Sequence, residues 1–323
     1  MKAMRVIEGG KLELQTDAPT PDPGAGQVRV RVRATALNRA DLLQRAGQYP
    51  APPDAPADIL GMEYAGEVDA VGPGVRELQV GHRVFGLVGG GSYAEYVIVP
   101  ERALSRLPAG MPFEEGAAIP EAFITAYDAM VLQGELRAGS VVLVQAAASG
   151  VGTAAVQIAK AVGAQVIATA RSEAKLATVR ALGADHTVHV QDACFAAAVT
   201  ALAPNGVDVV LELVGGAYVA EDVKVVATLG RIVLVGLVAG RSVELDLGAL
   251  LRKRARILGT VLRSRPLEEK IAAHRVLDAC LVPLFAEGKL KPVIDRVMEL
   301  ADADAAHERM KQNAGIGKIV LRV

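Results

Sequence analysis

Residues 141–155 constrain the fold more than any other stretch of the chain. The segment reads VVLVQAAASGVGTAA, an apolar run that ends in small residues and resumes with helical spacing. This pattern predicts a buried strand, a tight turn and a helix in that order. Such a turn presents main-chain N–H groups at a helix N-terminus, where they bind phosphate. The segment therefore indicates a dinucleotide-binding site.

Two kinds of sequence flank this segment. In the first third of the chain, alternating stretches such as 27–36 lie between Gly- and Pro-rich turns and predict a β-rich domain. From about residue 140, the apolar stretches 141–144, 166–170, 207–213 and 232–237 alternate with Ala-rich helical stretches. That alternation is typical of βαβ units and a parallel sheet. A chain of 323 residues has room for both domains, so the predicted fold class is α/β plus β.

Composition bears on the compartment and on the partners. The formal net charge of -1 gives no electrostatic reason to expect nucleic acid or a membrane surface. Cys194 and Cys280 are too few for a disulfide framework and are typical of a reducing cytoplasm. No stretch approaches the roughly 18 apolar residues of a membrane span, and residues 1–6 do not resemble a secretory signal. We expect a cytoplasmic protein that acts on a small molecule.

The turn itself is a degenerate form of the Rossmann fingerprint G-x-G-x-x-G. Aligned on Gly152, the first two glycine positions hold Ala147 and Ser149, and Gly150 adds a glycine one step further on. Small side chains still permit close approach of a pyrophosphate, and the Ser149 hydroxyl can donate to it. The alternative is a purely structural strand-to-helix turn. An esterase nucleophile elbow is rejected, because G-x-S-x-G is required and Ala147 and Val151 flank the serine.

The end of the second strand favours NADP over NAD. An NAD site has an acidic residue about 20 positions after the loop, which binds the ribose hydroxyls. Here Ala170 stands in that place, and Arg171, Ser172 and Lys175 follow. Cationic and hydroxyl side chains suit a 2′-phosphate, although the nearby Glu173 argues for NAD. In the alternative interpretation, Ser172 only caps a helix and the two cations are solvated.

Further motifs identify a family. They are ALNRADLLQR at 36–45, GQY at 47–49, IPEA at 119–122, LRSR at 262–265 and NAGIGKIV at 313–320. With these motifs the chain resembles the medium-chain dehydrogenase/reductase superfamily along essentially its whole length. Within it, the chain resembles the zinc-independent quinone oxidoreductase branch, which includes zeta-crystallin, and most closely the tumour-suppressor-inducible subgroup. The resemblance implies a GroES-like domain over residues 1–119, completed by 262–323, and a Rossmann NADP-binding domain over 120–261.

No metal site is expected. Zinc-dependent relatives carry a catalytic Cys before the first-domain helix, a G-H-E motif and four closely spaced cysteines. Here the first region, 38–41, has no Cys, and the second motif reads Gly61-Met62-Glu63. A structural zinc site normally needs four protein ligands and a catalytic one needs three, and neither set is present.

Without a Lewis acid, an electrophilic acceptor such as a quinone or an activated enone suits direct hydride delivery. The segment that faces the nicotinamide in relatives supplies three candidate catalytic residues. The Tyr49 hydroxyl and the Asn38 amide are candidate donors to the developing oxyanion, and Asp41 is a candidate to orient them or relay a proton. The alternatives are helix capping for Asn38 and Asp41 and plain packing for Tyr49.

The resemblance also implies contacts to the cofactor NADPH. Residues 149–152 would hold the pyrophosphate, Ser172 and Lys175 the 2′-phosphate, and Gly236 and Leu237 would border the nicotinamide. The remaining wall residues would be Thr125, Val214, Gly215, Leu262, Arg263 and Asn313.

Three functions compete at this point: an NADPH-dependent quinone oxidoreductase, an enoyl or alkenal double-bond reductase, and a non-enzymatic NADPH-binding protein. An alternating strand is predicted at 242–247, where it would form an edge of the Rossmann sheet. In relatives this edge pairs with its twin, so we expect a homodimer.

Overall fold

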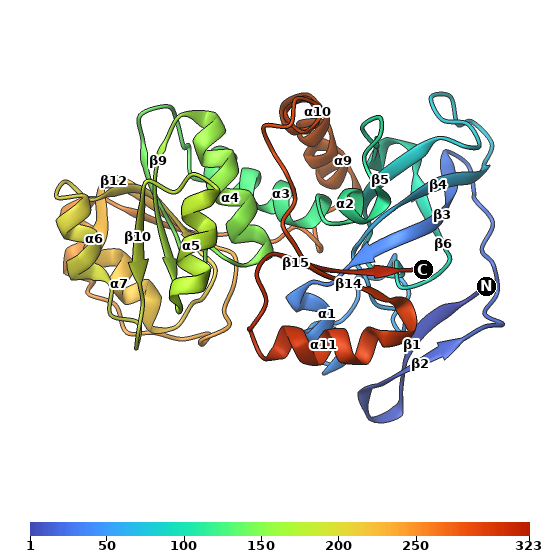
Figure 1. Cartoon of the computed structure of the whole chain (residues 1–323), viewed down its shortest axis with the longest axis horizontal. Coiled ribbons are helices and arrows are strands. Elements are labelled where there is room, and N and C mark those ends of the chain that lie inside the picture. Colours follow the sequence, from blue (N-terminus) through green and yellow to red (C-terminus); the bar gives the residue numbers. More distant parts are fainter. The chain divides into compact units, whose positions relative to one another are not determined.

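The computed structural model describes all 323 residues, which separate into two compact units (Figure 1). The first unit comprises residues 1–124 and 262–323, and the second comprises residues 125–261. The predicted boundary after residue 119 precedes the observed one, which falls inside the helix α3 (Pro120–Tyr127). No helix combines the length and the apolar character needed to cross a membrane.

The first unit is built on strands whose residues alternate between buried and exposed positions. They pair antiparallel, except for β14 and β15, which are parallel. A seven-stranded sheet has the order β14-β15-β3-β4-β5-β7, with β6 paired to β3, and β1 and β2 pair separately. The strands are β1 (Ala3–Ile7), β2 (Lys11–Gln15), β3 (Gln27–Ala36), β4 (Glu63–Val71), β5 (Arg83–Leu87), β6 (Tyr96–Pro100), β7 (Leu104–Arg106), β14 (Ile294–Glu299) and β15 (Lys318–Arg322). The helices are α1 (Arg39–Arg45), α2 (Phe113–Ala117), α3, α9 (Leu267–Val276), α10 (Val282–Ala286) and α11 (Ala303–Lys311).

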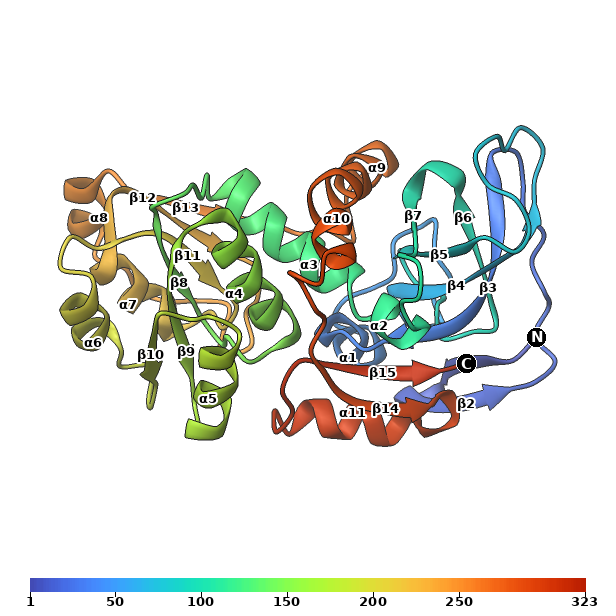
Figure 2. The same ribbon diagram turned by 45° about the horizontal axis from the view of Figure 1, so that its top comes forward.

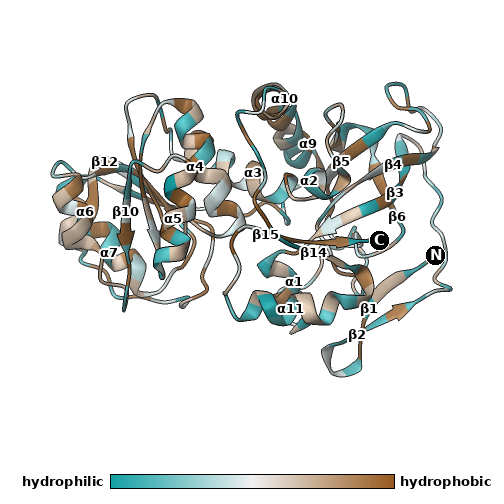
Figure 3. Cartoon of the chain, viewed as in Figure 1, coloured by the Kyte–Doolittle hydropathy of each residue, from teal (hydrophilic) through white to brown (hydrophobic).

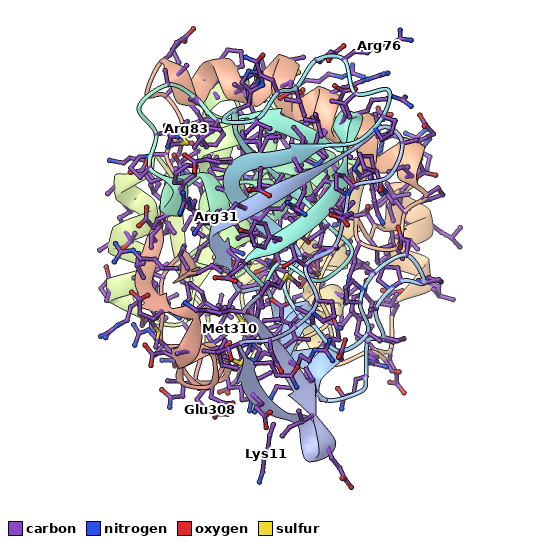
Figure 4. The ribbon with its side chains drawn as sticks, turned by 90° about the vertical axis from the view of Figure 1, so that its right-hand side faces the viewer. Lys11, Arg31, Arg76, Arg83, Glu308 and Met310 are labelled. Atoms are coloured by element: carbon purple, nitrogen blue, oxygen red, sulfur yellow. The ribbon has the colours of Figure 1, made fainter.

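The last strand of the chain completes this sheet. β15 runs antiparallel to β3, with Val320 opposite Ala36. Its residues Ile319 and Leu321 pack into a core shared with β1 and α11, and β15 is coloured brown in the hydropathy view (Figure 3). Charged side chains such as Arg76 and Lys11 point outward from this unit (Figure 4).

The second unit is a parallel sheet of six strands, as the βαβ pattern predicts. The order is β10-β9-β8-β11-β12-β13. The strands are β8 (Val141–Val144), β9 (Gln165–Ala170), β10 (His186–His189), β11 (Val207–Glu212), β12 (Val226–Leu234) and β13 (Arg256–Gly259). The helices are α4 (Gly150–Val162), α5 (Glu173–Ala181), α6 (Ala196–Leu202), α7 (Ala217–Val225) and α8 (Leu247–Lys253).

Helices cover both faces of this sheet, which explains its continuous apolar strands. α6 and α7 contribute Val199 and Val223 to one core, together with Leu143, Ile167 and Val210 of the strands. α4 buries Ala155 and Ile158, and Figure 2 shows α4 and α5 on the other side of the strands from α7 and α8.

Two predicted strands differ from the structure. The strand expected at 232–237 ends at Leu234, because the N–H groups of Val235 and Gly236 turn to donate to the Glu212 carbonyl. The strand expected at 242–247 does not form in this chain, and β13 is the last strand of the sheet. The alternation there was misleading because Asp246 instead caps α8, where its Oδ1 accepts a hydrogen bond of 2.9 Å from the Ala249 N–H.

Candidate active site

The predicted cofactor residues of the second unit gather at one edge of its sheet. Ala147, Arg171, Val214 and Gly236 follow β8, β9, β11 and β12, which are neighbours in the parallel sheet. The carboxyl ends of these strands therefore lie on the same edge. The strand order reverses between β8 and β11, and ligands of such sheets bind at that switch point.

The turn after β8 has the geometry of a phosphate cradle. Ser149 is the N-cap of α4, and its hydroxyl oxygen accepts a hydrogen bond of 3.1 Å from the Gly152 N–H. The Ser149 hydrogen remains available to a ligand. A Cβ on Gly152 would stand 2.6 Å from the Ala146 carbonyl oxygen, so only glycine permits this closure. The residues present therefore fit a pyrophosphate at the N-terminus of α4.

The end of β9 carries positive charge, and the nearest acidic residue in the sequence is paired with an arginine. Arg171 is exposed, and Ser172 occupies the N-cap position of α5, although its side chain makes no capping hydrogen bond. Glu173, the residue that argued for NAD, forms an ion pair with Arg180 on the same helix. Lys175 is half-buried one turn into α5. Ser172 therefore occupies the helix-capping position of the alternative interpretation, but its hydroxyl makes no hydrogen bond to the helix.

The turns after β11 and β12 are held by Glu212. Its carboxylate accepts hydrogen bonds from the N–H groups of Val214 and Gly215, the latter at 2.7 Å. Its carbonyl accepts bonds from the N–H groups of Val235, at 2.9 Å, and Gly236, at 3.3 Å. These are the turns predicted to border the nicotinamide. In the same unit, the buried Thr125 hydroxyl has no hydrogen-bond partner, which leaves it available to a ligand.

In the first unit, Asn38 and Asp41 belong to a helix cap. Asn38 is the N-cap of α1, and the Asp41 carboxylate accepts a hydrogen bond of 2.8 Å from the Asn38 backbone N–H. Asp41 also accepts a bond of 3.2 Å from the Gly61 N–H. Burial raises the pKa of Asp41 to about 6, against the lowering effect of these two bonds.

A buried ion pair lies beside this cap. Lys318 of β15 and Glu63 of β4 are 2.7 Å apart, with side chains 6% and 0% exposed. Lys318 also donates to the Leu37 carbonyl and to the Asn38 amide oxygen, each at 2.6 Å. Glu63 accepts from the Asn38 amide at 2.8 Å and from the Glu121 N–H at 2.8 Å. Buried charges of this kind are tolerated because every donor and acceptor is satisfied.

This network changes the roles open to the predicted catalytic residues. The Asn38 amide donates to Glu63 at 2.8 Å and to the Ala36 carbonyl at 3.4 Å. Both of its hydrogens are directed at protein acceptors, so the geometry disfavours the predicted use of Asn38 as an oxyanion donor. Asp41 is fully buried by its cap.

Tyr49 and Arg263 form a second group in the first unit. The Arg263 guanidinium lies 5.3 Å from the centroid of the Tyr49 ring, a cation–π geometry. Arg263 donates from Nε to the Gly89 carbonyl at 2.6 Å and from Nη2 to the Gln44 amide oxygen. Its buried Nη1 has no acceptor in the chain. Burial raises the pKa of Tyr49, and the charge of Arg263 opposes this shift.

The carboxyl of Glu121 is a further group in the first unit whose pKa is shifted. Burial, followed by the repulsion of Glu63, raises the pKa of its carboxyl to about 7, and Glu121 in turn contributes to the raised pKa of Tyr49. A carboxyl with such a pKa can hold a proton near neutral pH. Sequence reasoning missed Glu63, Lys318 and Glu121 as site residues. All three lie in motifs quoted above, Gly61-Met62-Glu63, IPEA and NAGIGKIV, but a motif does not reveal a partner that is distant in sequence.

The remaining predicted residues divide between the units. Leu262, which is buried, and Asn313 belong to the first unit. The Asn313 amide oxygen accepts a bond of 2.5 Å from Arg39. Leu237 lies in the second unit, in the turn after β12, and is 48% exposed.

Comparisons with known proteins bear on the family. Residues 24–109 match the family described as alcohol dehydrogenase GroES-like domain, and residues 150–278 match the zinc-binding dehydrogenase family. The quinone oxidoreductase of Rattus norvegicus is 34% identical over 328 residues, covering 99% of this chain and 97% of that protein. The polyketide synthase GfsB of Streptomyces halstedii is 40% identical over 292 residues, which are 89% of this chain but 5% of the synthase.

Solved structures agree over the whole chain. An NAD-dependent alcohol dehydrogenase is 36% identical, with a TM-score of 0.88 and 100% of both chains covered. A mycobacterial protein in complex with NADPH is 28% identical, also with a TM-score of 0.88 and 100% of both chains covered.

The chain belongs to the medium-chain dehydrogenase/reductase superfamily. Within it, the chain falls in the zinc-independent quinone oxidoreductase branch. The predicted resemblance and fold class, a GroES-like domain with a Rossmann parallel sheet, are thereby confirmed. Met62, where zinc-dependent relatives have the histidine of G-H-E, is buried. No group of three or more His, Cys, Asp or Glu side chains is placed to hold a metal ion.

The cradle after β8 yields a direct test. Replacing Gly152 by Ala would force the Ala146–Ala147 turn apart, so we expect NADPH to bind at least about tenfold more weakly, the loss of roughly one charge-assisted hydrogen bond. The measurement is titration of NADPH fluorescence. Gly259→Ala is the matched control, because a Cβ there meets no atom within 4 Å. Equal affinity of Gly152→Ala and wild type would show that this turn does not hold the pyrophosphate.

Proposed function

We propose that this oxidoreductase is an NADPH-dependent quinone reductase that works without a metal. The observation that carries the cofactor assignment is the end of β9. There Ala170 replaces the expected acid, Arg171 is exposed, and Glu173 is paired with Arg180. The relation to quinone oxidoreductases supports the acceptor class.

The residues of the second unit would hold NADPH along the carboxyl edge of its sheet. The N–H groups of Gly150 and Val151 and the Ser149 hydroxyl bind the pyrophosphate, and Arg171, Ser172 and Lys175 bind the 2′-phosphate. The Thr125 hydroxyl and the turns held by Glu212 line the nicotinamide end. When bound, NADPH supplies the hydride.

The first unit supplies the groups that stabilise the reduced acceptor. Arg263 Nη1 has no acceptor of its own, and the Tyr49 hydroxyl is the neighbouring proton donor. A quinone oxygen that gains negative charge is stabilised by such preorganised donors. Glu121 then serves as a proton source for Tyr49, because its carboxyl holds a proton near neutral pH. Asn38 and Asp41 position this segment through the cap of α1.

A double-bond reductase is the second candidate. The identity to a segment of a polyketide synthase exceeds that to the rat quinone oxidoreductase, which favours an enone or enoyl acceptor. The same hydride donor and the same oxyanion donors would serve, with the proton delivered to carbon. The third candidate, a protein that binds NADPH without turnover, leaves the orphaned donor of Arg263 without a role.

The quinone proposal is tested by NADPH oxidation at 340 nm with an ortho-quinone, a para-quinone and an enone in parallel. We expect turnover with a quinone to exceed that with the enone. Faster turnover of the enone would favour the second candidate, and no turnover with any acceptor would favour the third.

Arg171→Ala should raise KM for NADPH about tenfold or more with little change for NADH. Arg137→Ala, an exposed arginine of the same unit, is the control.

We further propose a cytoplasmic homodimer. Both cysteines are free and exposed, which suits a reducing compartment. β13 leaves one edge of the parallel sheet without a partner, and Leu251 and Val261 nearby in sequence are 76% and 55% exposed. Such an edge favours association.

The dimer has a simple test by light scattering after size exclusion at micromolar concentration. The expected mass is twice the 33.6 kDa of one chain. Val243→Asp in the segment 242–247 should shift the population toward monomer, whereas Arg76→Ala in the other unit should not. A monomeric wild type would contradict the proposal.

A further inference from the structure

Two buried carboxyl groups lie in the second unit, one at the carboxyl end of β11 and one on the helix α7. Glu212 is the last residue of β11, and Asp222 lies in the second turn of α7. Both are 0% exposed. Each carboxyl group acts on the pKa of the other, and each has one buried oxygen, Glu212 Oε2 and Asp222 Oδ2, without a hydrogen-bond partner.

The donors around this pair do not suffice for two ionised carboxylates. Glu212 Oε1 accepts from the N–H groups of Val214 and Gly215. Asp222 Oδ1 accepts from the Gln145 amide at 2.9 Å. Glu212 Oε2 and Asp222 Oδ2 receive no hydrogen from any other group of the chain. An ionised carboxylate only accepts hydrogen bonds, so these two carboxyl groups can satisfy each other only if one of them holds a proton.

We propose that Asp222 is a positioning residue. It carries a proton at neutral pH and donates a hydrogen bond to the ionised carboxylate of Glu212, which in turn holds the cofactor-side turn after β11. The proton sits on Asp222 because the two backbone N–H bonds stabilise the ionised form of Glu212. Burial and the charge of Glu212 raise the pKa of Asp222 well above its usual range. Burial also raises the pKa of Glu212, but its backbone bonds oppose that shift.

The shared proton closes a chain of hydrogen bonds that spans the cofactor edge. The Thr169 hydroxyl donates to the Gln145 amide oxygen at 2.6 Å, and Gln145 donates to Asp222. Thr169 also accepts, through its carbonyl, a bond of 2.9 Å from the Ala147 N–H in the phosphate turn. Glu212 lies at the other end and fixes Val214 and Gly215. The pair thus couples the phosphate turn to the nicotinamide-side turns.

No cationic side chain acts on the Glu212–Asp222 pair, and the charged groups on the neighbouring elements have other partners. On α7, Glu221 accepts from Lys224, and the pKa of Tyr218 is raised by burial and by the pair itself. On α8, Lys253 donates to the carbonyls of Lys224 and Val226. On β12, Arg231 pairs with Glu135. Near β11, Asp128 accepts from the Thr260 hydroxyl, and α6 carries no charged residue.

The proton makes the stability of this unit pH-dependent with a definite sign. Because the pKa of folded Asp222 lies above its unfolded value, folding favours the protonated form. The stabilisation is complete below the unfolded pKa and is lost as the pH rises through the folded pKa. Asp222→Asn cannot titrate, yet its amide can donate to Glu212 and its oxygen can still accept from Gln145.

The experiment follows thermal unfolding of the cofactor-free protein from neutral to alkaline pH. Wild type should lose stability as the pH rises, whereas Asp222→Asn should lose less, so that the curves diverge. Glu221→Gln, one residue away on α7, should keep the wild-type slope. Parallel curves for wild type and Asp222→Asn would overturn the proposal.

Two further readouts separate positioning from simple structural support. Infrared spectra of Glu121→Gln, in which the protonated carboxyl of Glu121 does not contribute, should contain at neutral pH the carbonyl stretch of a protonated buried carboxyl. The double variant Glu121→Gln/Asp222→Asn should lack it. Absence of this band in Glu121→Gln would overturn the proposal even if the double variant failed to fold. Asp222→Ala should weaken NADPH binding about tenfold, and Asp222→Asn should restore most of it. These readouts need no quinone, so the inference can fail or hold separately from the proposed reaction.

Discussion

The carboxyl end of β11 is the point on which the second unit depends. Glu212 bonds through its carbonyl to the turn after β12 and through its carboxylate to the turn after its own strand. The parallel sheet leaves these turns without ladder partners, because each strand has ended there. The buried side chain of Glu212 therefore fixes the turn after β11, and its backbone carbonyl fixes the turn after β12. The cradle at residues 146–152 is tied to the same system through Gln145 and Thr169.

The first unit rests on an analogous device. The Lys318–Glu63 pair joins the last strand of the chain to β4, to the cap of α1 and to the start of α3. Removing either partner would leave a charge in the interior, at a cost of about 3–5 kcal/mol. The pair also occupies the Asn38 amide, which moves the candidate donors to Tyr49 and Arg263. A structural network thereby decides which side chains remain available for chemistry.

What the sequence predicts well is local. The strands β3 and β8, the start of α4 and the phosphate turn follow from periodicity and small residues within short windows. Prediction from the sequence fails where contacts between residues distant in sequence determine the structure. Residues 242–247 alternate like a strand, but Asp246 caps α8 instead. Asn38 has the amide of a good donor, but Glu63 and Ala36 take its hydrogens. Asp222 looks like a surface acid of a helix until α7 is packed against β11.

We propose that the carboxyl edge of the second unit binds NADPH through its 2′-phosphate. Calorimetric titration of the purified protein with NADPH and with NADH, at one salt concentration, tests it most directly. We expect one NADPH per chain, bound about tenfold or more tightly than NADH, as a charge-assisted contact to phosphate predicts. Equal or tighter binding of NADH, or no binding of either, would contradict the claim.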